Sequence, residues 1–183
     1  VMDISVLEGK KELVARVLGD LQENTYIENG ALITIVDPKN LRPALLKLRD
    51  DDNLLFDLMS HMTAVDYSPR QPRFEVIYEL FSLFHKHRVR VKCPLGFVGV
   101  EYDKQSIDRV HDVHLTANWH ERECHDLFGI NFTGHPDLRR LLLPDDWDVY
   151  PCRKEYPFQG KASWQLGKNV ANAASMESDL GLE

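Results

Sequence analysis

The chain has 183 residues, 43% of them hydrophobic and 28% charged, which is the balance of a globular domain with its own core. Its 22 basic and 29 acidic residues give a net charge of −7. This charge disfavours nucleic-acid binding, because nucleic-acid-binding proteins neutralise phosphates with clustered Lys and Arg. No apolar run approaches the roughly 18–20 residues that span a bilayer, so we expect no direct membrane insertion and attachment to any membrane only through partners.

The first residues predict a helix followed by a hairpin. Leucines and valines at helical spacing predict a helix over about residues 8–20. Two short apolar runs follow, at residues 25–27 and 32–36. Between them lies Asn29-Gly30, a pair suited to the positive φ angles of a tight turn, so we expect the two runs to pair as strands.

A second helix and three longer strands come next. Asp37-Pro38 predicts the start of the helix, because Asp caps free N–H groups and Pro is tolerated at the first helical position. The strand candidates are residues 54–67, 74–80 and 88–93, the last with strict alternation of apolar and basic side chains. The order α-β-β-α-β-β-β predicts an α+β fold, a two-layer domain with a mixed sheet and helices on one face.

Two shorter helices are expected after this sheet. Ser106 is placed to cap a short helical piece that runs through Val110. Thr116 is placed to cap a second helix, which should end near Phe128 because Gly129 favours the left-handed conformation that terminates helices.

Beyond Gly129 the helical periodicity ends, and prolines, glycines and charges alternate with aromatic residues. Such a segment is too poor in aliphatic residues for a core of its own and too aromatic for a solvated linker. We therefore divide the chain into an α+β domain over residues 1–128 and an extended C-terminal arm over residues 129–183. Aromatic and Arg residues are common interface anchors, so we favour a partner as the surface that buries the arm. The tail after Lys161 is left open between a short helix and disorder.

The densest group of functional side chains is the run His-Glu-Arg-Glu-Cys-His-Asp at residues 120–126. On a helix, Glu121 reaches His125 and Arg122 reaches Asp126, since residues four apart share a face. Charges at this spacing usually form such intrahelical pairs or bonds to a neighbouring segment.

A metal site is the weaker interpretation of the same run. His120 and Cys124 lie one turn apart, and His111 or His114 would supply a third ligand; with Glu123 this set would describe a stand-alone metalloenzyme. The spacing lacks the second histidine of the H-E-x-x-H motif. There is also no CxxC pair for a zinc ribbon or an iron–sulfur cluster, and no glycine-rich phosphate loop.

One longer pattern starts in this run and continues into the arm. It reads Glu-Arg-Glu-x-x-Asp-Leu-Phe, then His after six residues, then Arg-x-Leu-Leu, and it resembles the signature of the thirty-kilodalton subunit family of the NADH:quinone oxidoreductase called complex I. The residues that carry this resemblance are Glu121, Arg122, Glu123, Asp126, His135 and Arg139. The resemblance covers about residues 8–160, with specific motifs from about 117 to 160.

The resemblance implies a fold and a function. Family members have an N-terminal α+β domain and an extended C-terminal arm, and they bind no cofactor and carry no active site. They dock on the neighbouring large quinone-site subunit, which is related to the hydrogenase large subunit, while flavin and iron–sulfur clusters sit in partner subunits. The complex passes electrons from NADH to a quinone, pumps protons, and places this subunit in a peripheral arm at the cytoplasmic face of the bacterial inner membrane.

Related complexes share this type of subunit. Membrane-bound hydrogenases and oxidoreductases fed by ferredoxin or a reduced deazaflavin remain alternatives, since other subunits select the electron donor. The sequence departs from the family pattern at Val149, Cys152 and Glu155, where Gly, Leu and Asp are usual. The loss of the glycine predicts an altered turn in the arm.

The resemblance also implies which residues form the framework. Their charges would fix the helix to the arm and to the partner subunits, with the aromatic residues as anchors and with no catalytic, cofactor-binding or metal-binding residue among them. The framework residues are Glu121, Arg122, Glu123, Asp126, His135, Arg139, Arg140, Trp147, Arg153, Lys154 and Tyr156.

Overall fold

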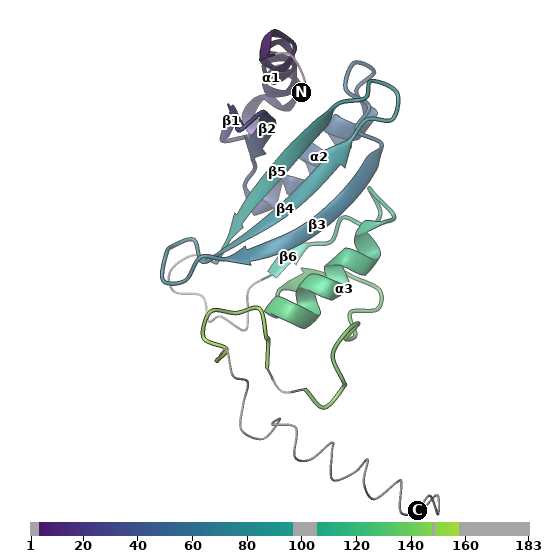
Figure 1. The fold of residues 1–183 in the computed structure, drawn as a ribbon. Helices are drawn as coiled ribbons and strands as arrows, with labels where there is room; N and C mark the ends of the chain where they lie inside the picture. Colours follow the sequence, from purple (N-terminus) through teal and green to yellow (C-terminus); the bar gives the residue numbers. More distant parts are fainter. Residues whose placement is uncertain (1–3, 97–105, 148, 158–183) are drawn as a thin grey trace, which may run out of the picture. The chain divides into compact units, whose positions relative to one another are not determined.

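The structure is a computed structural model that describes residues 4–96, 106–147 and 149–157. The chain divides into two compact units, Val1–Arg153 and Lys154–Glu183. All helices and strands described below belong to the first unit (Figure 1). In the described residues no helix combines the length and the apolar character needed to cross a bilayer.

The N-terminal part contains the predicted helix and hairpin. Helix α1 (Ile4–Leu18) continues into a short 3-10 helix and is followed by β1 (Asn24–Glu28) and β2 (Ala31–Ile35). The two strands pair antiparallel, and the turn between them has positive φ angles at Asn29 (51°) and Gly30 (75°). The Asn-Gly pair therefore forms the tight turn that its conformational preference predicts.

Helix α2 (Leu41–Asp50) is preceded by one turn of 3-10 helix at Pro38–Asn40. The carboxylate of Asp37 accepts a hydrogen bond of 2.9 Å from the N–H of Lys39, so it caps this turn as expected. One stripe of α2 is buried in the core and consists of Leu41, Ala44, Leu45 and Leu48.

Strands β3 (Leu58–Asp66), β4 (Phe74–Phe81) and β5 (Arg88–Leu95) form an antiparallel meander, and the complete sheet has the order β1-β2-β5-β4-β3. Because β2 and β5 run parallel, the sheet is mixed, and the predicted α+β class and element order are confirmed. In Figure 1, α2 lies behind the sheet and α3 (Ala117–Phe128) runs beside β3.

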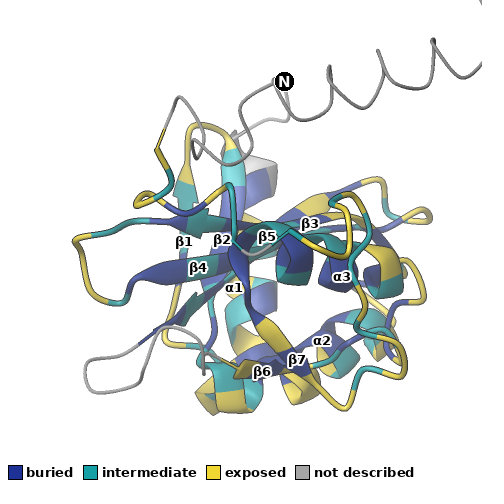
Figure 2. Cartoon of the chain, turned by 90° about the horizontal axis from the view of Figure 1, so that it is seen from below, coloured by how far each residue is buried: buried dark blue, intermediate teal, exposed yellow. Residues whose placement is uncertain are grey.

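Alternation along β4 and β5 separates a buried face from an open one. Every second residue of each strand is buried in the core that the helices cover, whereas residues of the other face are half-exposed and partly ion-paired, as are Glu75 and Lys92 at 3.2 Å. In Figure 2 the buried residues, in dark blue, gather where helices and sheet meet. This one-sided covering agrees with the predicted two-layer arrangement.

Two sequence predictions about element boundaries were wrong. The first strand of the meander starts at Leu58 and not at Leu54, because Leu55 adopts a positive φ of 44° and the preceding residues form turns. Residues 106–110 do not form a helical piece. Instead, β6 (Ser106–Asp108) pairs in parallel with β7 (Asn131–Thr133).

The short strands β6 and β7 are held by the core. Each has a buried central residue between two exposed ones, and these central residues are Ile107 and Phe132. That exposed-buried-exposed pattern suits a strand, and pairing with a segment far along the chain stabilises it over an isolated helical turn.

Both ends of α3 have defined contacts. The side chain of Thr116 does not cap the helix as predicted; its hydroxyl donates a hydrogen bond of 2.9 Å to the carbonyl of Met59 and so ties the start of α3 to β3. At the other end, Gly129 has a φ of 73°, and its N–H donates to the carbonyl of His125 at 2.9 Å. Gly129 thus terminates the helix in the left-handed conformation, as expected.

Residues 129–153, which we expected to begin the arm, pack in the same unit as the sheet. Strand β7 pairs with β6, and the N–H of Cys152 donates to the carbonyl of Leu127 at 3.1 Å. Two aromatic residues of the expected arm, Phe158 and Trp164, and the whole tail after Lys161 lie outside the described residues.

Candidate functional site

Helix α3 turns an unusually polar face toward the interior. Glu121 and Asp126 are fully buried and Arg122 is nearly so, while Cys124 beside them is also buried. A buried charge must be paired or hydrogen-bonded to be tolerated. The partners of these side chains therefore define the site.

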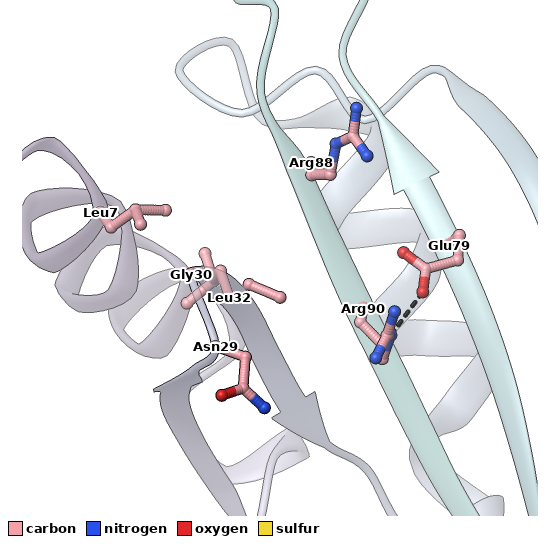
Figure 3. A pocket seen from close by; sticks show the side chains of 8 residues that line it. Leu7, Asn29, Gly30, Leu32, Glu79, Arg88 and Arg90 are labelled. Atoms are coloured by element: carbon pink, nitrogen blue, oxygen red, sulfur yellow. Dashed lines mark hydrogen bonds and ion pairs between the residues drawn. The ribbon is translucent and has the colours of Figure 1, made fainter. Parts of the chain in front are cut away.

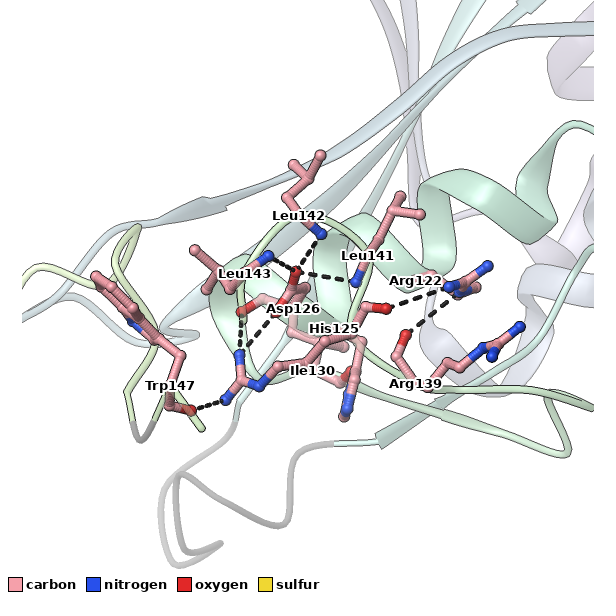
Figure 4. A network of polar contacts seen from close by, with 10 residues as sticks. Arg122, His125, Asp126, Ile130, Arg139, Leu141, Leu142, Leu143 and Trp147 are labelled. Atoms are coloured by element: carbon pink, nitrogen blue, oxygen red, sulfur yellow. Dashed lines mark hydrogen bonds and ion pairs between the residues drawn. The ribbon is translucent and has the colours of Figure 1, made fainter. Parts of the chain in front are cut away.

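Asp126 is the centre of the largest network (Figure 4). Its Oδ2 accepts hydrogen bonds from three consecutive backbone N–H groups, those of Leu141 (3.1 Å), Leu142 (2.7 Å) and Leu143 (2.9 Å). Its Oδ1 accepts from Nη1 of Arg140 at 2.7 Å. Burial raises the pKa of Asp126, but the N–H groups and the guanidinium outweigh burial and hold this pKa below its ordinary value. The carboxylate is therefore ionised at neutral pH.

Two arginines hold the arm by its backbone carbonyls. Arg122 donates from Nε to the carbonyl of Arg139 at 3.3 Å and from Nη2 to that of Arg140 at 3.2 Å. Arg140 in turn donates from Nη2 to the carbonyl of Trp147 at 2.6 Å. The guanidinium of Arg122 also lies 5.2 Å from the ring centre of Trp119. The chain from residue 139 to residue 147 is thereby fixed to α3.

A third arginine closes the end of the helix. Arg153 is buried, and its Nε donates to the carbonyl of Phe128, the last residue of α3, at 2.6 Å. Its guanidinium lies 4.4 Å from the ring centre of Tyr150. A Cβ atom on Gly129 would lie 2.5 Å from both Arg153 and Tyr150, so a larger residue there would force this pair to shift.

Glu121 forms a separate cluster on the same helix. Its Oε1 accepts a hydrogen bond of 2.6 Å from the N–H of Val110, and its Oε2 lies 3.5 Å from Nδ1 of His111 and 3.6 Å from Nε2 of His135. Burial raises the pKa of Glu121 from 4.5 to about 7, against the opposing effect of hydrogen bonds from the N–H groups of Val110 and His111.

His135 is held by the backbone on both sides of its ring. Its Nε2 lies 3.2 Å from the carbonyl of Asn118, and its Nδ1 accepts from the N–H of Asp137 at 3.1 Å. Because Nδ1 is an acceptor, the neutral ring carries its proton on Nε2. Burial lowers the pKa of His135, which favours this neutral form.

The remaining charged motif residues face the surface. Glu123 is half-exposed, and its Oε2 lies 3.6 Å from Nδ1 of His120, whose ring packs edge-on against His61. Arg139 has a 74% exposed side chain that pairs with the half-exposed Asp137 at 3.0 Å. Lys154, in the second unit, is exposed and Tyr156 is half-buried. The motif thus divides into buried residues that bind neighbouring backbone groups and partly or fully exposed residues on α3 and on the arm.

The proposed metal pair of His120 and Cys124 is not supported. Within the described residues, the single group of three potential ligand atoms comprises His111, Glu121 and His135. Cys124 is buried in the core, and burial raises the pKa of its thiol well above the ordinary value, which disfavours the thiolate that metals require. His120 instead pairs with Glu123.

Apolar side chains lie exposed beside this network. Leu115 is 85% exposed, Trp119 61% and Leu142 61%. Leu115 precedes α3, Trp119 lies in its first turn under the guanidinium of Arg122, and Leu142 is on the segment bound to Asp126. We call these three residues the exposed apolar set.

Comparison with known proteins assigns this architecture to a family. The family described as "Respiratory-chain NADH dehydrogenase, 30 Kd subunit" matches residues 34–162, which include the whole polar network. The chain belongs to this family. The predicted resemblance to the thirty-kilodalton subunit is therefore confirmed.

Individual relatives agree with the family assignment. The NADH-quinone oxidoreductase C subunit of Citrifermentans bemidjiense is 43% identical over 150 residues, which cover 82% of this chain and 86% of that protein. The C 2 subunit of the Rhizobium meliloti NADH-quinone oxidoreductase is 39% identical over 142 residues, 78% of this chain and 75% of the relative. A solved chain from the membrane-bound sulfane sulfur reductase, an archaeal respiratory membrane complex, shares the fold with a TM-score of 0.71 at 24% identity, covering 89% of this chain and 92% of that one.

In this member of the thirty-kilodalton family, sequence reasoning identified the buried charges and missed most of their partners. Helical spacing paired Arg122 with Asp126, whereas each binds the arm. Sequence reasoning also missed that the N–H group of Val110 binds Glu121. A sequence does not show which backbone N–H groups will act as donors. The adjacent Arg139-Arg140 pair was therefore the one sequence signal for the segment that binds α3.

A pocket of about 420 Å³ lies away from this network, between α1, the β1–β2 turn and the middle of the sheet (Figure 3). It is lined by Leu7, Asn29, Gly30, Ala31, Leu32, Glu79, Arg88 and Arg90. Arg90 donates to Glu79 across β4 and β5, so its charge is already neutralised. The pocket shares no residue with the motif network.

Proposed function

We propose that this chain is a non-catalytic core subunit in the peripheral arm of a proton-translocating NADH:quinone oxidoreductase, and that it docks on and stabilises the large quinone-site subunit. The relatives named as C subunits of NADH-quinone oxidoreductases support the type of complex. The observation that carries the structural role is the use of Asp126, Arg122 and Arg140 to hold the backbone of the arm.

The network supports a framework role because its charges are already engaged. Asp126 accepts from four donors, and Arg122 donates to two carbonyls. Groups fixed by this many charge-assisted hydrogen bonds stabilise one backbone path and present no free acid, base or nucleophile to a substrate. On this proposal the chain carries no active site and no redox cofactor, and flavin and iron–sulfur clusters belong to partner subunits.

The exposed apolar set supports a docking surface next to the network, because Trp119 contacts Arg122 and the backbone of Leu142 binds Asp126. Aromatic and Arg residues in a desolvated centre supply much of the binding energy of interfaces. Trp119 meets this description together with the exposed Arg139, and Leu115 and Leu142 extend the apolar area. In the proposed complex, this surface contacts the large subunit at the cytoplasmic face of the bacterial inner membrane.

The test is a substitution in the exposed apolar set, with circular dichroism to verify that the variant is folded. Trp119→Ala should weaken association with the other subunits by about 2 kcal/mol, a roughly 30-fold rise in Kd, as for a central aromatic anchor. The matched control is Phe84→Ala, which removes a 78% exposed aromatic side chain from the turn between β4 and β5.

Co-purification of the complex and NADH:quinone activity per assembled complex are the two measurements. We expect the Trp119 variant to yield less complex with normal activity in what assembles, and the Phe84 variant to behave like the wild type. A normal yield of complex with lost electron transfer would contradict the framework role.

A further inference from the structure

Three side chains from separate segments bring ligand atoms to one point. His111 follows β6, Glu121 lies on α3 and His135 follows β7, and their closest ligand atoms all lie within 4.8 Å of one another. Oε2 of Glu121 is 3.5 Å from Nδ1 of His111 and 3.6 Å from Nε2 of His135. Around a tetrahedral zinc ion with bonds of about 2.0–2.1 Å, neighbouring ligand atoms are about 3.4 Å apart. Two of the three separations thus already suit such an ion.

The two oxygens of Glu121 have different surroundings. Oε1 is held by the N–H of Val110, while Oε2 has no hydrogen-bond partner among the described residues. Nδ1 of His111, which faces Oε2, is likewise buried without a partner in the described part of the chain. Carboxylates that bind metals are typically oriented by such a hydrogen bond to the other oxygen, and buried polar atoms without partners are costly.

We propose that His111, Glu121 and His135 form a binding site for one divalent transition-metal ion, with Zn²⁺ the best match. Two imidazoles and one carboxylate are a common zinc ligand set, and the fourth position is left for water. The ion would join the segment after β6, helix α3 and the segment after β7. This site departs from the expectation that the chain binds no metal, and it is independent of the proposed docking role.

Metal binding requires His135 to change its hydrogen bonds. In the metal-free form its Nε2 carries the ring proton and faces the carbonyl of Asn118, and its Nδ1 accepts from Asp137. Metal binding at Nε2 requires the proton to move to Nδ1 and both of these hydrogen bonds to break. They are bonds between uncharged groups, and the bond from Asp137 lies at the surface, so an ion that engages all three ligands can replace them.

The test uses the untagged full chain, freed of metal with a chelator and then titrated with Zn²⁺ in a calorimeter. Co²⁺ provides a second probe, because its absorption spectrum reports tetrahedral nitrogen and oxygen ligation. We expect one equivalent to bind. His111→Asn and His135→Asn should each weaken binding by about 100-fold or more, since even the loss of a group that only orients a ligand costs 10–100-fold.

Matched controls come from the same helix. His120→Asn and Cys124→Ser should bind Zn²⁺ like the wild type, because neither side chain belongs to the group of three. His111 is the primary position for substitution, since its side chain is partly exposed and its replacement leaves the buried Glu121 in place. Circular dichroism verifies that each variant is folded.

Thermal unfolding gives a readout that does not depend on the calorimeter. Zn²⁺ should raise the Tm of the wild type and of the two controls and leave the Tm of the His111 variant unchanged. A wild-type chain that binds no Zn²⁺ would overturn the proposal. So would a folded His111→Asn variant that binds as tightly as the wild type, or a loss of binding in either control.

Discussion

Replacing Asp126 by Asn tests whether the network stabilises the fold. The substitution keeps the shape of the side chain and removes its charge. At present Oδ2 accepts from the N–H groups of residues 141–143 and Oδ1 accepts from Arg140. An amide has one oxygen, so its NH₂ group must face either the guanidinium or the three N–H groups, donor against donor.

The expected loss is about 3–5 kcal/mol, the cost of breaking a buried ion pair by removing one partner. The residue is fully buried, and hydrogen bonds to a charged group are worth about 1.5–3 kcal/mol each, so one lost bond and one unpaired guanidinium already reach this range. A domain of ordinary stability, about 5–15 kcal/mol, would lose a large part of its margin.

The assay is urea unfolding of the full chain at pH 7. The control is Asp137→Asn, the same chemical change in a carboxylate that is half-exposed and paired with the exposed Arg139. A surface pair of this kind contributes about 0–1 kcal/mol, so the control should unfold nearly as the wild type. Limited proteolysis should cleave the Asp126 variant between residues 137 and 147, where the wild type is protected.

A loss below about 1 kcal/mol for Asp126→Asn, or a loss equal to that of the Asp137 control, would refute this reasoning. Either result would mean that the arm keeps its position without the charge of Asp126. The charge would then have to be explained by contacts outside this chain.

Two further predictions concern the end of α3 and the buried Glu121. In thermal unfolding, Gly129→Ala should destabilise the chain by more than about 2 kcal/mol, because strain at a φ of 73° adds to contacts of 2.5 Å with Arg153 and Tyr150. The control Gly134→Ala has a φ of 79° and its nearest atom at 3.5 Å, so in the same assay it should cost only the strain, about 1 kcal/mol. The pKa of Glu121 is about 7 in the folded state and 4.5 in the unfolded state, so between these values the folded state binds more protons. The resulting stabilisation is fully present below about pH 4.5 and is lost as the pH rises through 7, by about 3 kcal/mol in total. Urea unfolding from pH 5 to 8 with chelator present should show this loss in the wild type and not in Glu121→Gln; parallel pH profiles for the two proteins would contradict it.

The sheet was predictable from sequence because its signals are local. Alternation along residues 88–93 and the Asn29-Gly30 pair each specify a conformation within a few residues, and the core agrees with both. Strand β6 gave no such signal. Three residues are too few to show a period, and their partner strand lies more than twenty residues further along the chain.

Several residues of the candidate site were predictable from the sequence, but the contacts between them were not. The run at residues 120–126 was identifiable because it is dense in charge, and Gly129 because a helix end favours glycine. The grouping of His111 with His135 depends on the pairing of β6 with β7, which brings the segments after both strands next to α3. No sequence spacing encodes that approach, since it is a product of tertiary packing.

The parallel pairing of β2 with β5 has a consequence for how the chain folds. The β1–β2 hairpin and the β3–β4–β5 meander each form from neighbouring segments, and they meet along only three residue pairs, from Ile33 and Arg90 to Ile35 and Lys92. In the sequence, α2 and most of the meander lie between β2 and β5. Pairing of strands so far apart along the chain is slow compared with local pairing. We therefore expect the sheet to assemble from two locally folded pieces, with the pairing of β2 and β5 as the slow step that sets the order of the strands.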